Sequence, residues 1–217
     1  MTEGQHRTIL LVALVVAGAL GGCIGPVVKP DFMSPAFDPA QVDTICLMPT
    51  MVFASFPVPD LDESIWKGTR AHFQQKKYDC VRVRDKSLVD GIARGDISGA
   101  NAAVLAKVGP PEARYLLFFV LAERPGGPTA FGTARQTVAG GLIVPVTMLR
   151  YNLDLTAYLF DRTRGEMLWS NREDVRLQYG PIRQRKSRLP TKGEAGRLGD
   201  GVLMGAAIAM NGFPYKR

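Results

Sequence analysis

Hydrophobic and polar residues follow one another along the chain in patterns that predict several strands and one long helix. Residues 42–52 and 114–122 are apolar almost throughout, which is typical of strands buried on both faces of a sheet. In residues 62–76 the apolar positions recur at helical spacing and predict an amphipathic helix. Residues 150–160 alternate between apolar and polar side chains and predict a strand with one buried face. This succession predicts an α/β domain.

A second alternating strand follows the long helix, at residues 78–83. Its pattern places Val81 and Val83 toward the core and Arg82 and Arg84 toward solvent. Because the helix separates it from the first buried strand, the two strands are predicted to be neighbours in a β-α-β unit.

The C-terminal half of the chain predicts an antiparallel hairpin and a closing helix. Residues 161–165 read Asp-Arg-Thr-Arg-Gly, which is turn chemistry because aspartate can bind its own backbone and glycine can take a positive φ. The turn leads to a returning strand at 167–170, where Trp169 is expected in the core. The predicted fold class is therefore α/β, with a mixed β-sheet flanked by helices. Helices other than the long one are predicted at residues 87–93, 99–108 and 200–213.

The predicted domain spans residues 42–217. One segment before it and one segment within it lack periodicity. Residues 25–41 contain four prolines and predict an extended tether. Residues 123–149 are rich in glycine and proline and predict an inserted surface loop over the sheet, or a hairpin. Inside this insertion a short apolar run is a candidate docking patch. The run consists of Leu142, Ile143 and Val144.

The N-terminal residues have the organisation of a secretion signal. An uncharged apolar stretch at 8–20 follows Arg7; it is shorter than the ~20 residues of a membrane-spanning helix and is typical of a signal-peptide core. The next residues, Leu-Gly-Gly-Cys ending at Cys23, resemble the lipobox of bacterial lipoproteins. The resemblance implies transfer of diacylglyceryl to the Cys23 thiol, removal of the signal peptide 1–22, and acylation of the freed amine. An ordinary signal peptide, or an uncleaved anchor with a chance cysteine, is the alternative.

A lipid on Cys23 would join residues 23–41 to a membrane. Each buried methylene contributes about 0.8 kcal/mol, so two or three acyl chains hold a protein at the bilayer effectively for good. Ile24 stands after the cysteine in place of an aspartate. By resemblance to other lipoproteins, this implies the periplasmic face of the outer membrane.

Charge narrows the choice of partners. The 217-residue chain has a formal net charge of +7 and a pI of about 9.5. This draws an exported protein toward anionic lipid head groups, lipopolysaccharide phosphates or an acidic protein partner, and argues against nucleic acid. A basic run in the polar segment 171–197 is either a solvated loop or a contact for phosphate-bearing lipid or an acidic partner. The run consists of Arg183, Arg185, Lys186 and Arg188.

Few residues could carry catalysis, a cofactor or a metal. Once residues 1–22 are removed, His72 is the single histidine, and it is expected as a hydrogen-bonded residue at the rim of the helix's apolar face. No Gly-x-Ser-x-Gly motif accompanies it, and there is neither a Cys-x-x-Cys motif nor a histidine pair. The glycine pairs at 126–127 and 140–141 lack the Lys-Ser/Thr of a phosphate-binding loop. The sequence therefore predicts no enzymatic activity, no cofactor and no metal.

Three further residues allow two interpretations each. Cys46 and Cys80 fall in the two strands predicted to be neighbours, and are either two small buried hydrophobes or a disulfide in an oxidising compartment. Trp66 is expected to pack in the core, with an interface anchor as the alternative.

Several of these segments, in this order, resemble one group of envelope proteins. The group comprises the curli-secretion lipoprotein CsgG, the penicillin-binding-protein activator LpoB and the N-terminal domain of TolB. The similar segments are the strand ending in Met48-Pro49, the amphipathic helix, the strand YDCVRV at 78–83, the strand at 115–121, and the hairpin YLFDRTRGEMLWS at 158–170. The resemblance implies an α/β domain of two or three layers around a mixed sheet. It does not fix the function, because members act as secretion pores, enzyme activators and scaffolds.

The expected function is a non-catalytic accessory or scaffold that docks to another cell-envelope component, with a homo-oligomer left open. The alternatives are a subunit of a CsgG-like outer-membrane secretion complex and a secreted envelope enzyme. A secretion pore would need membrane hairpins with strands of ~9–11 residues. Glycines and Pro145 interrupt the insertion at 123–149, and the basic run falls where lipid-facing positions of a second hairpin would lie. Pore formation is therefore the less favoured interpretation.

Overall fold

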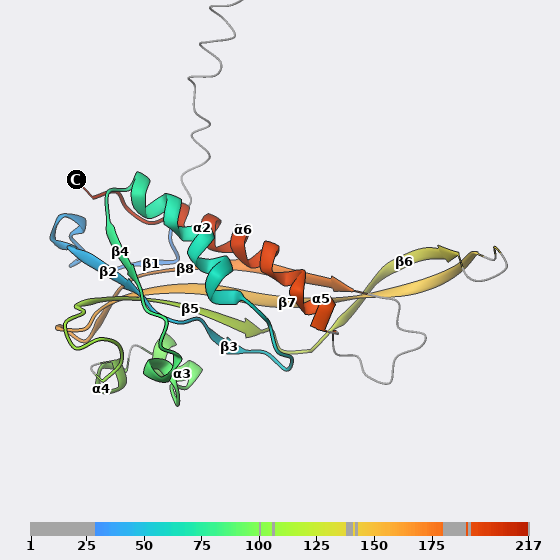
Figure 1. Ribbon diagram of the computed structural model, residues 1–217, viewed down its shortest axis with the longest axis horizontal. Coiled ribbons are helices and arrows are strands. Elements are labelled where there is room, and N and C mark those ends of the chain that lie inside the picture. The colour runs from blue at the N-terminus through green and yellow to red at the C-terminus, as the bar shows by residue number, and fades with distance from the viewer. Residues whose placement is uncertain are drawn as a thin grey trace, which may run out of the picture.

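The computed structural model describes residues 29–99, 101–105, 107–137, 141, 143–179, 190 and 192–216. They form an eight-stranded mixed sheet with helices against both faces (Figure 1). The strand order is β1-β8-β7-β5-β2-β4, with β3 also paired to β5 and β6 also paired to β7. The predicted α/β class, the mixed sheet, the antiparallel hairpin and the closing helix are confirmed.

The strands are β1 (Phe32–Met33), β2 (Thr44–Leu47), β3 (Met51–Phe53), β4 (Asp79–Arg82), β5 (Tyr115–Glu123), β6 (Thr129–Thr137), β7 (Ile143–Asp161) and β8 (Glu166–Tyr179). The α-helices are α2 (Leu61–Gln75), α3 (Arg94–Ser98), α4 (Ala102–Leu105), α5 (Lys192–Gly196) and α6 (Leu198–Asn211). The 3-10 helices are η1 (Pro39–Gln41) and η2 (Lys86–Val89).

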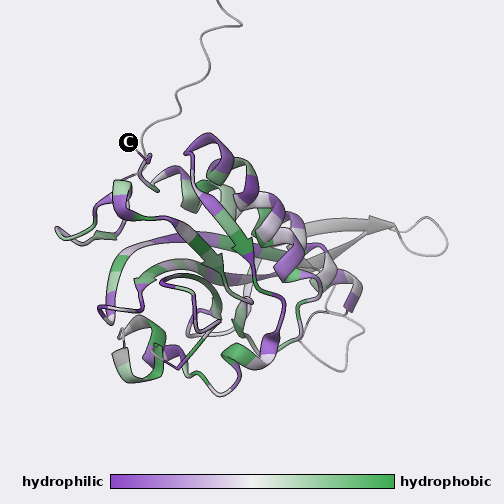
Figure 2. Cartoon of the chain, turned by 60° about the vertical axis from the view of Figure 1, so that its left-hand side comes forward, coloured by the Kyte–Doolittle hydropathy of each residue, from purple (hydrophilic) through white to green (hydrophobic). Residues whose placement is uncertain are grey.

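The central strand is β5, which is parallel to β2 and antiparallel to β7. Its residues from Tyr115 to Ala122 are all buried, as their continuous apolar sequence predicts. On one face α2 and α6 cover the sheet, and Ile45 and Leu47 of β2 belong to that core. On the other face η2, α3 and α4 lie against the sheet, and Cys46 belongs to that second core. Figure 2 shows hydrophobic stretches on the central strands and hydrophilic ones on the outer turns of the helices.

The apolar stretch 42–52 forms two strands, β2 and β3, instead of the single strand predicted. Leu47 pairs with Leu117 of β5, whereas Met51 pairs with Val120, so one extra residue lies on the β2–β3 side. The interruption falls at Pro49, which has no N–H to give to the sheet. As predicted, this proline ends the first strand.

Helices α2 and α6 lie side by side on the sheet (Figure 1) and approach each other at Gly68. A Cβ atom at this position would lie well inside van der Waals distance of the Leu203 carbonyl oxygen and 3.2 Å from the Ala206 Cβ. On the sheet side of α6, a Cβ at Gly205 would lie 3.0 Å from a methyl carbon of Val175. The small residues of α6 therefore permit close packing against α2 and against β8.

The orientation predicted for residues 78–83 is only partly confirmed: Val83 packs against the second core and Arg84 is exposed, as predicted, but Val81 and Arg82 differ. Val81 is 54% exposed, whereas the Arg82 side chain is only 16% exposed and donates to Glu63 at 2.7 Å. The reason is that β4 is the edge strand next to β2: Val81 lies beside Cys46 but stays exposed at this edge, whereas Arg82 reaches Glu63 of α2. An alternating pattern does not tell which of its two faces is covered.

The second half of the predicted tether, residues 32–41, belongs to the folded domain. Phe32 and Met33 pair with Ser170 and Trp169 of β8, and the Ser34 N–H donates to the Leu168 carbonyl. The Phe37 ring is buried in the core. The prolines of this segment therefore do not prevent it from packing against the domain.

The insertion predicted as a loop or a hairpin is a hairpin. β6 pairs antiparallel with β7, from Thr129↔Arg150 to Thr137↔Ile143. Among the described residues, β8 joins β7 only from Leu149 onward, so this ribbon extends beyond the sheet (Figure 1). We call residues 129–137 and 143–149 the arm; its extension away from the sheet corrects the prediction of a loop lying over it. The returning strand is also longer than predicted, because β8 continues to Tyr179.

The short helices also differ from the prediction. Residues 87–93 contain three of the four residues of η2, and the described part of 99–108 contains the single turn α4. Gly91 takes a φ of 77°, which a longer helix could not include. Buried side chains from these segments nevertheless fill the second core. They include Ile92 and Leu105, and Ile97 of α3 lies between them in the sequence and in the same core.

Candidate functional site

Most of the site residues that the sequence suggests lie outside the described residues. These are Cys23, Leu142, Arg183, Arg185, Lys186 and Arg188. Of the candidate docking patch, Ile143 is 60% exposed at the start of β7, and Val144 lies in β7 opposite Gln136. The arm therefore presents at least one large apolar side chain to solvent.

The arm leaves the sheet at a junction that is braced by one arginine. Arg124 follows the end of β5, and its backbone N–H donates to the Asn152 carbonyl of β7. Its guanidinium donates to Asp154 at 2.7 Å and also contacts Asp174, which lies opposite Asp154 on β8. The positive charge joins two carboxylates that would otherwise repel each other across the strands. This contact holds β5, β7 and β8 together where the arm begins.

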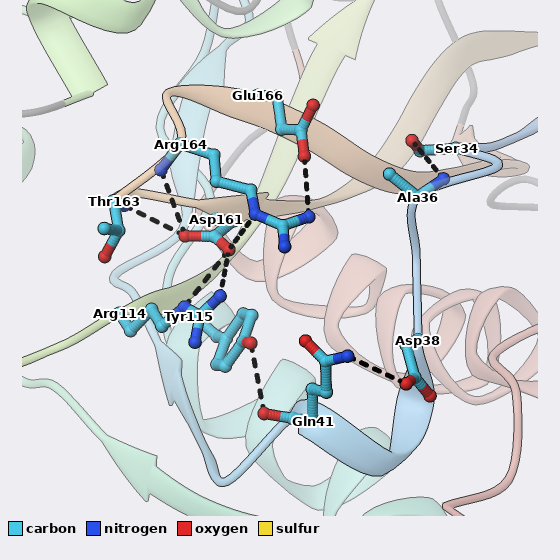
Figure 3. Close-up of polar contacts among 10 residues, drawn as sticks. All are labelled: Ser34, Ala36, Asp38, Gln41, Arg114, Tyr115, Asp161, Thr163, Arg164 and Glu166. Atoms are coloured by element: carbon cyan, nitrogen blue, oxygen red, sulfur yellow. Dashed lines mark hydrogen bonds and ion pairs between the residues drawn. The ribbon is translucent and has the colours of Figure 1, made fainter.

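The opposite end of the β7–β8 hairpin is closed by a buried carboxylate (Figure 3). Asp161 is 1% exposed and accepts hydrogen bonds from the backbone N–H groups of Thr163 and Arg164, at 3.0 and 3.2 Å. The Arg114 side chain donates to its other oxygen from Nε and Nη2, at 3.1 and 2.8 Å. Burial opposes the charged form, but these hydrogen bonds outweigh burial and lower the pKa of Asp161.

This arrangement confirms the predicted turn. Gly165 takes a φ of 67°, and its N–H donates to the Asp161 carbonyl at 2.8 Å. Each oxygen of the Asp161 carboxylate already accepts hydrogen bonds from the protein (Figure 3). Its surroundings stabilise the turn and give the carboxylate no proton-transfer geometry.

A polar surface pocket of about 440 Å³ lies where α2 begins, beside the carboxyl ends of β2 and β4. Four of its charged groups form two ion pairs: Lys86 with Asp62 at 3.4 Å and Arg82 with Glu63 at 2.7 Å. The hydrogen bond from Arg82 lowers the pKa of Glu63. Asp62 also accepts from the Thr50 N–H at 2.6 Å, which gives this N–H a partner in the interruption between β2 and β3. The pocket's lining contains no histidine, cysteine or serine that could act as nucleophile or base.

His72 and Lys76, at the C-terminal end of α2, are both at least half-buried. His72 is half-buried, as predicted, but its Nδ1 has no hydrogen-bond partner among the described residues, so the predicted hydrogen bond is not found at this atom. Burial, and then the charge of Lys76, lower the pKa of His72. Lys76 itself is 3% exposed; its Nζ donates to the carbonyls of Asn211, at 3.1 Å, and of Phe213. Lys76 thus binds the C-terminal end of α6, a role that the sequence did not indicate.

The two cysteines lie on neighbouring strands, as predicted, but on opposite faces. Cys80 pairs with Ile45, and Cys46 pairs with Val81, so the two thiols belong to the two different cores. Both are free, which excludes the disulfide and leaves the hydrophobic interpretation. Burial raises the pKa of Cys46 and raises that of Cys80 to about 12.

The two tryptophans differ in burial. Trp169 is fully buried, as predicted, and its ring meets Phe213 edge to face at 4.9 Å. Trp66 is partly buried and packs against the same core, in agreement with the packing interpretation.

Two kinds of functional element are not found in the described part of the chain. It contains no group of three or more histidine, cysteine, aspartate or glutamate side chains that could hold a metal ion. None of its helices combines the length and the hydropathy that crossing a bilayer requires.

Comparison with known proteins yields structural similarity only. No protein-family model matches the chain, and no curated protein matches it. The fold is similar to a neuraminyllactose-binding hemagglutinin homolog from Helicobacter pylori, with 9% identity and a TM-score of 0.43 over 80% of this chain and 86% of that one. It is also similar to the PelC dodecamer from Paraburkholderia phytofirmans, with 14% identity and a TM-score of 0.41 over 86% and 96% of the two chains.

A third similar structure is lipoprotein GNA1162 from Neisseria meningitidis, with 18% identity and a TM-score of 0.35 over 74% of this chain and 95% of that one. At these identities and TM-scores the similarities assign neither a family nor a function. They do not confirm the resemblance to CsgG, LpoB and TolB.

Proposed function

We propose that this chain is a lipid-anchored protein of the bacterial cell envelope that docks, without catalysing a reaction, onto another envelope protein through its arm. The anchor is the lipid on Cys23 that the lipobox-like sequence implies, at the periplasmic face of the outer membrane. The docking role rests on one observation: the arm continues β7 beyond the sheet with β6 as its only described partner strand.

A two-stranded ribbon is marginally stable by itself in water, because it buries little apolar surface. Among the described residues, no further strand pairs with its outer edges, whose backbone N–H and C=O groups are therefore open to a partner. A partner that adds a strand to one edge would supply those hydrogen bonds, and an apolar pocket on the partner could receive Ile143, which is 60% exposed. The bracing of the junction by Arg124 fits an arm that is held in position for such a partner.

The polar sites of the body favour a non-catalytic role. Asp161 accepts hydrogen bonds from Arg114 and from the turn backbone, and four charged groups of the α2 pocket form two ion pairs. General acid–base catalysis requires a group that can reach a substrate's proton. These groups are instead occupied by contacts within the protein.

The arm can be removed without changing the rest of the sheet. Replacing residues 131–148 with Asn-Gly would close the hairpin near the register pair Ala130↔Leu149, with a turn suited to two antiparallel strands. This variant should keep the parent's circular dichroism and thermal stability while failing to restore the phenotype of a strain that lacks the gene. Full restoration by the truncated protein would contradict the proposal.

The partner can be trapped in intact cells with a photoreactive residue placed at Ile143, and at the exposed Val81 of β4 as the matched control. The arm position should give a discrete cross-linked protein that the control position does not give, and Ile143→Asp should abolish the phenotype rescue. Equal cross-linking from both positions would contradict docking through the arm. Capture of a second copy of this chain from the arm would favour a subunit of an oligomeric complex over an accessory protein.

A further inference from the structure

Among the exposed large apolar side chains, two lie on the outward surface of one helix. Met204 is 63% exposed and Ile208 is 39% exposed; they are four residues apart and therefore on the same side of α6. The buried positions of α6, such as Val202 and Ala209, face the sheet. Met204 and Ile208 thus form a solvent-facing apolar stripe on the helix layer.

The outward surface of the two helices carries exposed charges of both signs, including Asp200 one turn before Met204. Helix α2 lies beside α6 (Figure 1), and its Lys67 and Arg70 are exposed. Lys67 lies 3.8 Å from Glu63. Arg82 also contacts the Glu63 carboxylate, at 2.7 Å, so the negative charge of Glu63 is divided between the two cations. The charges therefore do not select an anionic surface, and the feature that favours a bilayer is the pair of exposed apolar side chains.

The described chain begins beside α6. Phe32 of β1 pairs with Ser170 of β8, and the next β8 residue, Asn171, donates to the Ala209 carbonyl of α6 at 2.9 Å. Asp31 lies close enough to Glu173 to add to the effect of burial and raise the pKa of that carboxyl. Glu173 in turn is next to Gly205 of α6. The segment through which the chain enters the domain is therefore adjacent to the part of α6 that carries the apolar stripe.

The distance to the membrane follows from chain length. Lys29, the first described residue, comes six positions after Cys23. A fully extended chain spans at most ~3.3–3.6 Å per residue, so this segment reaches no further than about 20 Å. This is about twice the diameter of one helix with its side chains. A lipid on Cys23 therefore keeps α6 close to the bilayer.

We infer that the outward surface of α6, with Met204 and Ile208 at its centre, contacts the lipid bilayer to which the protein is anchored. The inference rests on the proposed lipidation of Cys23 and adds an orientation to it: the helix layer faces the membrane. The arm, which continues the sheet's long axis (Figure 1), then runs along the bilayer rather than into it.

The contact can be measured on the full-length lipidated protein in vesicles of phosphatidylethanolamine and phosphatidylglycerol that contain a brominated phospholipid. Met204→Trp and Ile208→Trp place a fluorophore in the stripe. Val81→Trp, on the β4 edge and 54% exposed, is the matched control. Brominated lipid should quench the fluorescence added at 204 and 208, and should leave that added at 81 unchanged.

The failure of this inference is distinguishable from the failure of the proposed function. A lipid mass on Cys23 without quenching at 204 or 208 would overturn the bilayer contact and leave the anchor standing. Absence of quenching together with a dimer in sedimentation would assign the stripe to a second copy of the chain. Absence of lipid on Cys23 would refute both the anchor and the orientation.

Discussion

Replacing Gly68 with alanine adds a single methyl group at the point where α2 crosses α6. In a solvent-exposed helix this change is favourable, because alanine loses less backbone entropy than glycine, by roughly 0.5–1 kcal/mol. Here the new Cβ would lie inside van der Waals distance of the Leu203 carbonyl oxygen, which belongs to the backbone, and 3.2 Å from the Ala206 Cβ. Neither group can rotate away, so the two helices would have to separate.

The expected magnitude is the difference between these two effects. Overpacking of a close contact costs about 1–3 kcal/mol. After subtraction of the helix-propensity gain, Gly68→Ala should lower the free energy of unfolding by about 1–2 kcal/mol. Gly201→Ala is the matched control within α6, because its Cβ would lie 3.4 Å from a methyl carbon of Val175, an ordinary contact. That variant should be more stable than the parent by about 0.5–1 kcal/mol.

Both variants can be compared by urea unfolding of the mature chain carrying Cys23→Ser, which removes the lipid. With a denaturant dependence of about 2 kcal/mol per molar urea, the midpoint should fall by roughly 0.5–1 M for Gly68→Ala and rise slightly for Gly201→Ala. A Gly68→Ala protein as stable as the parent would refute the reasoning, since it would show that the helices are not in contact at this residue.

Three further predictions concern single side chains. Trp169→Ala should lower the free energy of unfolding by about 3–5 kcal/mol because the indole is fully buried, and Trp66→Ala should cost less; an equal decrease for both variants in urea unfolding would contradict this difference in burial. The pKa of His72 is lowered in the folded state, so the unfolded chain takes up the proton first and stability should fall as the pH drops below about 6.5. His72→Gln should flatten that decline, and identical pH profiles would count against it. Cys46 and Cys80 should both titrate as free thiols after unfolding without reductant, whereas a mass two hydrogens lower would reveal the excluded disulfide.

Local sequence chemistry predicted the elements whose geometry it determines directly. The uninterrupted apolar run at β5 fits only a strand covered on both faces, and all its residues from Tyr115 to Ala122 are buried. The aspartate and glycine of residues 161–165 predicted the hairpin turn because each supplies a specific backbone contact or conformation. Predicting these features requires no information about residues that are distant in the sequence.

The arm was only one of two interpretations because a proline and several glycines interrupt its sequence. Pro145 lies within β7 opposite Arg135, at a point where the described structure gives β7 a strand on one side only. A proline is tolerated at such an edge, since its missing N–H can face away from the paired strand. Pairing of this kind depends on which strands surround the residue, and the sequence does not show that.

Two other features depend on tertiary context. Val81 alternates like a core residue but is exposed, because β4 is the last strand at its edge of the sheet. Lys76 appears in the sequence as one of two consecutive lysines at the end of a helix, but it is buried against the C-terminal end of α6, 135 residues further along the chain. For the same reason, the sequence could not predict the open strand edges of the arm or the exposed surface of α6. Strand edges and exposed helix faces are defined only after folding.

The anchor at Cys23 is the first part of the proposed function, and the contact of α6 with the bilayer depends on it. It is tested most directly by mass spectrometry of the N-terminal peptide from protein extracted from bacterial membranes. We predict a peptide that begins at Cys23, with diacylglyceryl on the thiol and a fatty acid on the amine. A peptide in which Gly22 is still joined to Cys23, or a mature Cys23 with a free thiol, would contradict the anchor.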